Sequence, residues 1–321
     1  MATMNMIQAL NLALREEMER DKDVVILGED VGKDGGVFRV TEGLYDRFGP
    51  GRVMDTPLAE TGIVGAAVGM AAYGLKPVVE IQFMGFIYSA IDQIFSHAAR
   101  IRARSRGRFT VPLVVRTPYG GGVKALEHHS ESTEALFCHM PGLKVVVPSS
   151  PRIAKGLLLS AIRDPDPVLF LEPTRLYRLV KEDVPEIDYT VPLGKARIVQ
   201  EGSDVTVIAW GSMLQRTMKA VEGYNAEVID LMTLSPFDEE AVLRSAKKTG
   251  RVVIVHEATT TCGLGAELSA TIAEFAMLYL KAPIVRVAAY DVVLPLPKLE
   301  DRYLPSIDKI RKAIETVLQY T

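Results

Sequence analysis

One carboxylate in this sequence stands where its chemistry needs an explanation. The stretch MDTPLAETGIVGAAVGMAAYG covers residues 54–74, and every residue from Gly62 to Gly74 is apolar or glycine. Glu60 lies just before this segment, and a carboxylate that is buried without a partner is costly. One interpretation is structural: Thr56 caps the following helix, Pro57 stands in its first turn, and the acid complements the helix dipole. The other is that Glu60 has a chemical role.

Two adjacent histidines, His128 and His129, form a second candidate site. They lie in RTPYGGGVKALEHHSES, residues 116–132, after three consecutive glycines. Glycines allow backbone angles that bring a loop close to a ligand. The loop leaves the carboxyl end of an expected strand, which is where open α/β sheets place their ligands. Composition alone leaves the alternative that both histidines are exposed loop residues.

Two further patterns predict structure rather than chemistry. Five arginines fall between Arg100 and Arg108, and in an acidic chain such a helix end is typical of a solvated or subunit-facing surface. The turn HEATTTCGLGAELSA, residues 256–270, offers Gly263 and Gly265 but not the full G-x-G-x-x-G pattern. We therefore predict neither a nucleic-acid surface nor a dinucleotide site.

Short segments rich in Val, Leu and Ile alternate with helical patterns along the first half of the chain. They are apolar on both faces, as strands of a covered parallel sheet are. The expected strands are 23–29, 76–83, 109–117, 143–148 and 167–172, and the expected helices are 58–74, 87–106 and 150–163. The N-terminal residues also show helical spacing. This alternation predicts an α/β layer architecture.

A second α/β series follows a charged, proline-containing stretch, residues 176–204, which we interpret as a linker. The expected strands of this series are 204–210, 226–231, 251–257 and 283–289, and its expected helices lie near 212–222, 238–249, 264–280 and 306–320. We therefore expect two domains, 1–186 and 187–321, of which the second is the smaller.

Composition narrows the class of protein. Hydrophobic residues make up 48% and charged residues 24% of 321 residues, which is typical of a globular protein. The net charge is −3, so no overall basic field favours nucleic acid or an acidic membrane. Cys138 and Cys262 stand far apart, which fits a reducing compartment. The longest apolar run is shorter than the roughly 20 residues that span a bilayer. We expect a cytoplasmic protein.

Several long motifs, taken in order, carry a resemblance to a known family. They are RVMDTPLAETGIVG, AIDQIFSHAAR, HHSES, PGLKVVVPSSP, AIRDPDPVLFLEP and DVVLPLPKLEDRYLP. The chain resembles, nearly end to end, the beta subunit of the thiamine diphosphate-dependent, decarboxylating first component of 2-oxo acid dehydrogenase complexes. The pyruvate and branched-chain members look most similar. The resemblance implies a parallel-sheet α/β domain that binds the aminopyrimidine of thiamine diphosphate, followed by a smaller α/β domain like the C-terminal domain of transketolase.

The resemblance also implies roles for individual residues. Glu60 matches the acid that hydrogen-bonds a ring nitrogen of the cofactor and shares a proton with it, and the apolar helix beside Glu60 is expected to bury it. Phe86 matches the aromatic residue that stacks on the aminopyrimidine. His129 matches a histidine that orients or protonates intermediates and receives the lipoyl group. Glu29 and Asp92 match acids near the cofactor and its acidic tunnel.

The AIRDPD turn resembles a potassium site built largely from main-chain carbonyls. The residues that match it are Leu113, Ala161, Ile162, Asp164 and Asp166. Relatives often carry asparagine where this chain has Asp166.

The Gly-Asp-Gly motif with which thiamine enzymes hold Mg²⁺ and the diphosphate does not occur in the sequence. The resemblance therefore implies that an alpha subunit holds the magnesium and shares the cofactor, in an α2β2 heterotetramer. That assembly would decarboxylate a 2-oxo acid and acylate a lipoyl group carried by the acyltransferase core of the complex.

Two alternatives stay open. The C-terminal half of a split transketolase would keep the fold, although the chain reads HHSES where a transketolase-like T-H pattern would stand. A non-enzymatic scaffold subunit would use Glu60 only to complement the helix dipole.

Overall fold

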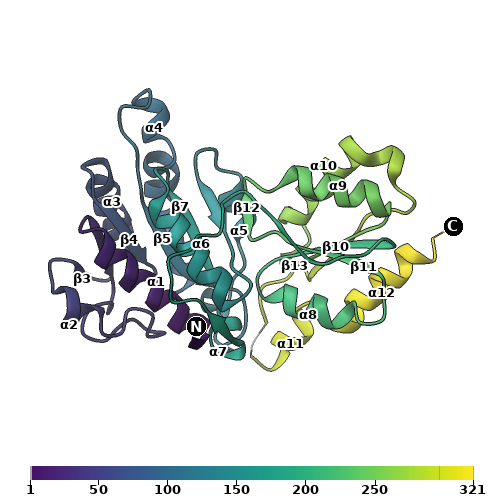
Figure 1. Cartoon of the computed structure of the whole chain (residues 1–321), viewed down its shortest axis with the longest axis horizontal. Helices are drawn as coiled ribbons and strands as arrows, with labels where there is room; N and C mark the ends of the chain where they lie inside the picture. The colour runs from purple at the N-terminus through teal and green to yellow at the C-terminus, as the bar shows by residue number, and fades with distance from the viewer. Residues whose placement is uncertain (1, 296, 321) are drawn as a thin grey trace.

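The computed structural model describes residues 2–295 and 297–320, which form two α/β units side by side (Figure 1). The first unit is built on a seven-stranded sheet with the order β12-β6-β7-β5-β4-β2-β3. Its strands are β2 (Val24–Gly28), β3 (Val53–Asp55), β4 (Lys76–Glu80), β5 (Val114–Tyr119), β6 (Lys144–Val146), β7 (Val168–Pro173) and β12 (Thr233–Ser235). All of its pairings are parallel except that of β12 with β6.

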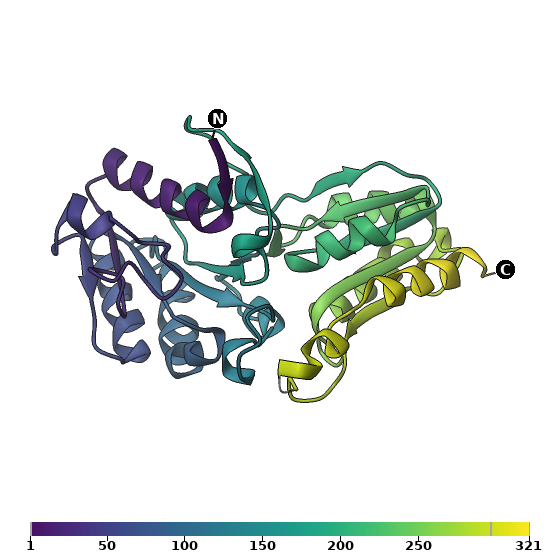
Figure 2. The same ribbon diagram turned by 90° about the horizontal axis from the view of Figure 1, so that it is seen from below.

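Helices cover both faces of the first sheet, which explains why its central strands are apolar throughout. On one face, α1 (Met6–Arg20) packs against α6 (Pro151–Arg163). On the other face lie α3 (Glu60–Ala72) and the segment that follows β4. Figure 2 shows α1 and these later helices on opposite sides of the sheet. Asn5 and Gln8 form a capping box at the start of α1, while Ser150 and Pro151 begin α6.

The second unit is a five-stranded sheet with the order β14-β13-β10-β11-β9. Its strands are β9 (Arg197–Gln200), β10 (Val205–Ala209), β11 (Ala226–Asp230), β13 (Val252–Thr259) and β14 (Val285–Ala289), and only β9 runs antiparallel to its neighbour. Helices α8 (Ser212–Ala220) and α12 (Ile307–Leu318) cover one face, while α9 (Glu239–Thr249) and α10 (Leu264–Ala276) cover the other (Figure 1).

Short elements complete the described chain. They are β1 (Ala2–Asn5), α2 (Leu44–Phe48), η3 (Glu127–His129), α5 (Glu134–Cys138), α7 (Leu176–Leu179), β8 (Lys181–Val184), η4 (Met277–Tyr279), η5 (Pro297–Leu299) and α11 (Glu300–Tyr303). The predicted α/β architecture with mostly parallel sheets is confirmed. The predicted division between 1–186 and 187–321 falls in the chain between β8 and β9.

The interpretation of residues 176–204 as a linker is wrong for residues 176–184 and 197–200. Leu176 and Tyr177 are buried in the first unit, because α7 and β8 pack there and β8 pairs with β1. Residues Arg197–Gln200 form β9, which pairs with β11 in the second sheet. The high proportion of charged residues in this stretch hid elements that are short and lie at sheet edges.

The segment predicted as a helix over 87–106 is helical for most of its length, but it is not one regular α-helix. The chain forms a 3-10 helix, η1 (Met84–Ala90), then a π-helical segment, η2 (Gln93–Ala98), and then α4 (Ile101–Arg104). Met84, Ile87 and Ala90 are buried at intervals of three residues, which matches the three residues per turn of a 3-10 helix. Likewise β5 begins at Val114 and not at 109.

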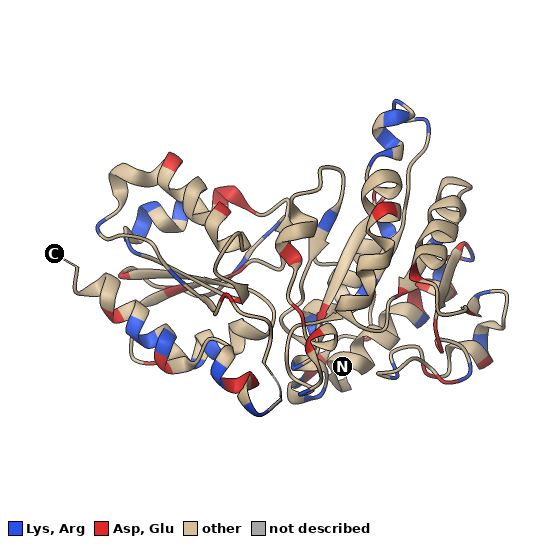
Figure 3. Ribbon diagram, turned by 180° about the vertical axis from the view of Figure 1, so that it is seen from behind, with Lys and Arg blue, Asp and Glu red and all other residues tan. Residues whose placement is uncertain are grey.

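Charged residues of both signs are distributed over the surface, and a basic tip stands out beyond α4 (Figure 3). The five arginines of residues 100–108 are all exposed, as expected for a solvated helix end. None of the helices in the described part of the chain combines the length and the apolar character that a membrane-spanning segment needs.

Candidate functional site

Four of the predicted site residues follow the carboxyl ends of four adjacent strands. The strands β5, β4, β2 and β3 are neighbours in the first sheet and run parallel. Glu29 follows β2, Glu60 follows β3, Phe86 follows β4 and His129 follows β5. Because parallel strands end at the same edge of the sheet, the topology brings residues of distant sequence to one edge. Open α/β sheets bind their ligands at this edge.

Two carboxylates form an acidic pair at this edge. Glu29 is only 8% exposed, and burial together with the negative charges of Glu60 and Asp30 raises its pKa. Glu60 is the first residue of α3, where Ser89 Oγ donates a hydrogen bond to its Oε2 at 3.4 Å. Neighbouring acids of this kind favour a proton on one of the two carboxyl groups.

The expectation that Glu60 is buried is wrong for this chain. Glu60 is half-buried, and Gly62, Ala66 and Gly69 along the same helix are exposed. The apolar segment has only one face against the core, where Ile63, Val64, Ala67, Val68 and Ala71 lie. The other face of α3, with its small residues, is open to a partner surface or a ligand.

The structural interpretation of Thr56 as a helix cap is also wrong. Helix α3 begins three residues later than this interpretation requires, and its N-cap residue is Ala59, which makes no side-chain cap hydrogen bond. Thr56 Oγ1 is buried and has no hydrogen-bond partner among the described residues. The DTPLAE segment is therefore held in place without using its own hydroxyl, and Glu60 faces the site from an uncapped helix end.

An aromatic cluster stands beside the acidic pair. The ring centroid of His129 lies 4.2 Å from that of Phe83 and 5.4 Å from that of Phe86, and both contacts are edge-to-face. Phe83 also contacts Phe86. His129 Nδ1 is buried and has no hydrogen-bond partner among the described residues. His128 is exposed and packs against Gly85, where an added Cβ would lie 2.5 Å from its ring nitrogen. His129 is therefore the histidine that belongs to the cluster.

Three buried charged residues, Arg116, Glu80 and Glu172, form an ion triad in the sheet, and it connects to the aromatic cluster through Tyr177 and Phe38. This triad was not predicted from the sequence. Arg116 donates hydrogen bonds to Glu172 at 2.7 and 2.9 Å and to Glu80, and all three side chains are buried in adjacent strands. Tyr177 donates to Glu172 at 2.6 Å, and its ring packs in a tilted orientation against Phe38, which in turn contacts Phe83. Charged residues inside apolar strands were the signal that could have revealed this network.

Asp92 contacts neither the acidic pair nor the aromatic cluster. It is exposed and precedes η2, and its carboxylate accepts a hydrogen bond from the adjacent Gln93 at 3.3 Å. Gln93 faces Gly65 on α3. The structure thus places Asp92 on the flank of the helix that carries Glu60, without a contact to the acidic pair.

The candidate potassium residues lie together around one turn. Lys144 Nζ lies 2.6 Å from Asp164 and 3.5 Å from Asp166, and Arg102 binds Asp166 through both carboxylate oxygens at 2.7 and 2.8 Å. The carbonyls of Leu113 and Ala161 accept backbone hydrogen bonds. The Asp164 and Asp166 carboxylates are therefore paired with cations of the chain, and a potassium ion held by main-chain carbonyls here, that of Ile162 included, stays a prediction.

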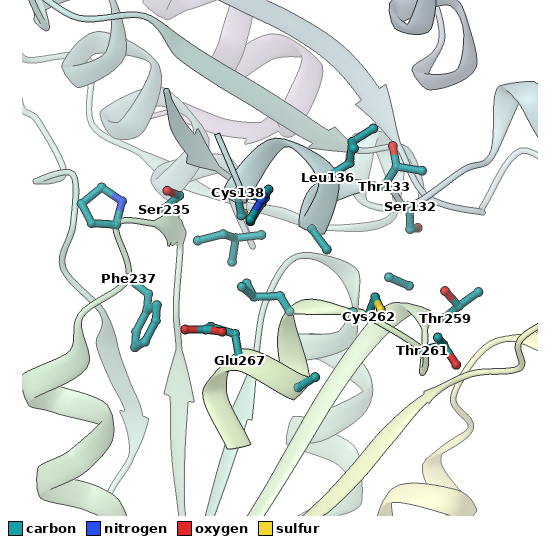
Figure 4. Close-up of a pocket in the computed structure, with 18 of the residues that line it drawn as sticks. Ser132, Thr133, Leu136, Cys138, Ser235, Phe237, Thr259, Thr261, Cys262 and Glu267 are labelled. Carbon is teal, nitrogen blue, oxygen red and sulfur yellow. The ribbon is translucent and has the colours of Figure 1, made fainter. Parts of the chain in front are cut away.

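A cleft between the two units contains none of the predicted site residues. It has a volume of about 940 Å³ and is lined by α5, the Leu234–Phe237 segment and the turn before α10. Figure 4 shows Cys138 and Cys262 in its wall. Among residues 2–295 and 297–320, no three His, Cys, Asp or Glu side chains come together as a metal-binding group.

Comparisons with known proteins fit this geometry. Residues 2–180 match the transketolase pyrimidine-binding domain, and residues 194–310 match the transketolase C-terminal domain. The pyruvate dehydrogenase E1 component subunit beta of Acholeplasma laidlawii is 52% identical over 97% of this chain and 96% of its own length. The chain belongs to the family of pyruvate dehydrogenase E1 beta subunits.

Other members of the E1 beta family are similar over their full length. The protein of the same name from Staphylococcus epidermidis is 49% identical over all of both chains, and that from Staphylococcus aureus is 50% identical over 99% of each. Among solved structures, a split gene transketolase, described as an inactive beta4 tetramer, matches with a TM-score of 0.81 over 99% of both chains. Its identity is 23%, so this likeness concerns the fold.

Proposed function

We propose that this E1 beta chain supplies the aminopyrimidine half of a shared thiamine diphosphate site. The observation that carries the proposal is the meeting of Glu29, Glu60, Phe86 and His129 at one sheet edge. An acidic pair fits a basic ring nitrogen, since a proton shared with that nitrogen offsets the repulsion between the two carboxylates. The partly exposed ring of Phe86 offers a flat apolar surface for a heterocycle.

In this proposal Glu60 holds or accepts the proton at the ring nitrogen. Its carboxylate at the start of α3 is accessible from outside the chain, and Glu29 behind it limits how much negative charge the pair tolerates. Bound thiamine diphosphate supplies the carbanion chemistry that removes carbon dioxide from a 2-oxo acid. The chain's own contribution is to orient the ring and to move one proton.

His129 would act on the reacting groups at the same edge. Its unpartnered Nδ1 lies in the aromatic cluster, where a bound ligand could complete its hydrogen bonding. This position suits a side chain that orients or protonates reacting groups and receives the lipoyl arm that accepts the acyl group. Asp92, on the flank of the same helix, would line the acidic approach to the cofactor.

A partner chain would supply the rest of the site. The sequence contains no Gly-Asp-Gly motif for magnesium, so an alpha subunit would hold magnesium and the diphosphate in an α2β2 heterotetramer. The open face of α3 and the accessible Glu60 support a site completed by another subunit. The lipoyl-bearing acyltransferase core would be the acyl acceptor.

The relatives' names favour pyruvate over branched-chain 2-oxo acids as the substrate. The fold likeness to a split gene transketolase keeps a transketolase half as the second candidate. Assays of the assembled enzyme with pyruvate, branched-chain 2-oxo acids and ketose phosphates distinguish the three. Turnover of ketose phosphates alone would contradict the dehydrogenase proposal.

The substitution Glu60→Gln tests the proton role. With an alpha subunit present, we expect pyruvate-dependent activity to fall by roughly 10²- to 10⁴-fold, the usual contribution of a general acid–base. The matched control is Glu239→Gln, because Glu239 is also the first residue of a helix and is exposed. A loss of less than threefold for Glu60→Gln, or an equal loss for the control, would refute the assignment.

A further inference from the structure

The loop that carries His129 is closed at its base. Residues 120–131, here called the histidine loop, begin at Gly120, whose N–H donates a hydrogen bond to the carbonyl of Glu131 at 3.0 Å. Tyr88 also hydrogen-bonds the Glu131 side chain. The position of His129 at the sheet edge therefore depends on how this base is held.

The second unit holds the base through one buried carboxylate. Glu257 lies on β13 and is 3% exposed. The Gly121 N–H donates to its Oε1 at 2.6 Å, and the Ser212 hydroxyl donates to its Oε2 at 2.5 Å. Because both oxygens are engaged and the side chain is buried, Glu257 forms a stiff link between β13, the start of α8 and the histidine loop.

The three glycines are needed for this close approach. Gly120 has a φ of +75°, and a Cβ there would lie 2.7 Å from Glu257 Oε1. Gly122 has a φ of +144°, and a Cβ there would lie 2.7 Å from the backbone of Arg175. A side chain at Gly120 would push the loop away from Glu257 in the second unit, and one at Gly122 would push it away from the Arg175 backbone in the first unit. The glycine run thus serves contact within the chain rather than loop flexibility.

A second buried acid lies beside the first. Glu300 begins α11, is fully buried and pairs with Arg175 at 3.2 Å. A Cβ on Gly121 would lie 3.1 Å from the Glu300 carboxyl carbon, so the loop base fits between Glu257 and Glu300. From the first unit, the Thr174 hydroxyl donates to the carbonyl of Gly120 at 2.8 Å. Contacts from both units therefore fix the backbone where the loop begins.

We propose that Glu257 is a positioning residue for His129. By fixing the base of the histidine loop from the second unit, it places the imidazole against Phe83 and Phe86, where acyl transfer requires it. The inference rests on the proposed function of His129. It gives the second unit a part in the chemistry, although that unit contributes no side chain to the acidic pair or the aromatic cluster.

The chain offers a matched pair of substitutions as a test. Ser212→Ala removes the hydroxyl that donates to Glu257, and Ser149→Ala removes a hydroxyl that donates to another buried carboxylate, Asp230, also at 2.5 Å. Asp230 lies on β11 of the second unit and also pairs with Arg197, so the Ser149–Asp230 bond links the two units away from the histidine loop. Glu257→Met removes both acceptor oxygens at nearly constant volume, and Glu257→Gln keeps one acceptor oxygen.

The assembled enzyme is assayed for two partial reactions, acyl transfer from pyruvate to free lipoamide and decarboxylation with an artificial electron acceptor. We expect Glu257→Met to lower kcat for acyl transfer by roughly 10- to 100-fold with little change in the KM for lipoamide, since a small misplacement of a reacting group has this effect. Ser212→Ala should lower kcat for acyl transfer at least about threefold, and Ser149→Ala should lower it less than about twofold. Glu257→Gln should keep most of the wild-type activity.

A double-mutant cycle distinguishes positioning from a general loss of stability. Adding Glu257→Met to His129→Ala should lower kcat for acyl transfer little further than His129→Ala alone, because both changes act on the same imidazole. Three results would overturn the inference while leaving the function of His129 intact. They are losses of kcat that multiply in the double variant, an effect of Glu257→Met on KM only, and equal losses of kcat in Ser212→Ala and Ser149→Ala. If His129→Ala itself leaves acyl transfer unchanged, both proposals fall. If Glu257→Met does not assemble, the serine pair decides.

Discussion

Replacement of Glu134 by glutamine should stabilise the protein, and increasingly so as the pH rises. Glu134 begins α5 directly after the histidine loop and is fully buried. Trp210 Nε1 donates to its Oε1 at 3.3 Å, and its Oε2 has no hydrogen-bond partner among the described residues. Burial raises the pKa of Glu134 from 4.5 to about 7, and the charge of Glu257 adds to this.

The raised pKa of Glu134 determines how the free energy of unfolding depends on pH. In the folded chain Glu134 keeps its proton up to about pH 7, whereas in the unfolded chain it loses the proton near pH 4.5. The folded state therefore binds more protons between these values, and its stability falls as the pH rises through this window. At about 1.4 kcal/mol per pH unit, the full loss above pH 7 is about 3 kcal/mol. Glutamine stays neutral and avoids this loss.

Urea unfolding of the full chain provides the assay, with wild type and Glu134→Gln compared at several pH values from 5 to 8.5. The free-energy difference between them should grow from pH 5 to about pH 7 and then stay constant near 3 kcal/mol. Glu16→Gln serves as the control, because Glu16 is a half-buried acid that already pairs with Lys155. A difference that is independent of pH, or one that shrinks as the pH rises, would refute the reasoning.

Two further predictions concern groups below and beside the site. Arg116→Leu leaves the Glu80 and Glu172 carboxylates buried without their cation and should lower the free energy of unfolding by about 3–5 kcal/mol. Arg47→Leu, which breaks an exposed pair with Glu19, should cost no more than about 1 kcal/mol, and equal losses in urea unfolding would contradict the burial argument. For the potassium site that the resemblance implies, replacing potassium by choline at constant ionic strength should lower the Tm of the assembled enzyme. An unchanged Tm would exclude a potassium ion that contributes to stability.

The sequence predicted the elements whose signal is local. The buried strand Val24–Gly28 and the helix Pro151–Arg163 were predicted almost to the residue, because apolar periodicity and capping residues lie within each segment. The segment after β4 was misassigned for a tertiary reason. Its buried residues recur at intervals of three and then four, and only packing against α3 and the sheet decides the helix type at each point.

The candidate site divides in the same way. Glu60, Phe86 and His129 could be named from motifs, and the order of the strands then brings them together. The contact between Gly121 and Glu257 could not be named, because 136 positions separate the two and nothing in either local sequence indicates the other. The half-exposed state of Glu60 was equally out of reach, since it depends on which face of an apolar helix meets the core.

The antiparallel strand β12 has a consequence for how the chain is synthesised. It completes the first sheet by pairing with β6, yet it lies between β11 and α9 of the second unit. On the ribosome, the first unit therefore emerges with β6 paired to β7 on one side only, and its other edge stays unpaired until Thr233–Ser235 has left the exit tunnel. An unpaired sheet edge is a place where nascent chains associate wrongly. The last strand of the first sheet is thus supplied by the half of the chain that is synthesised second.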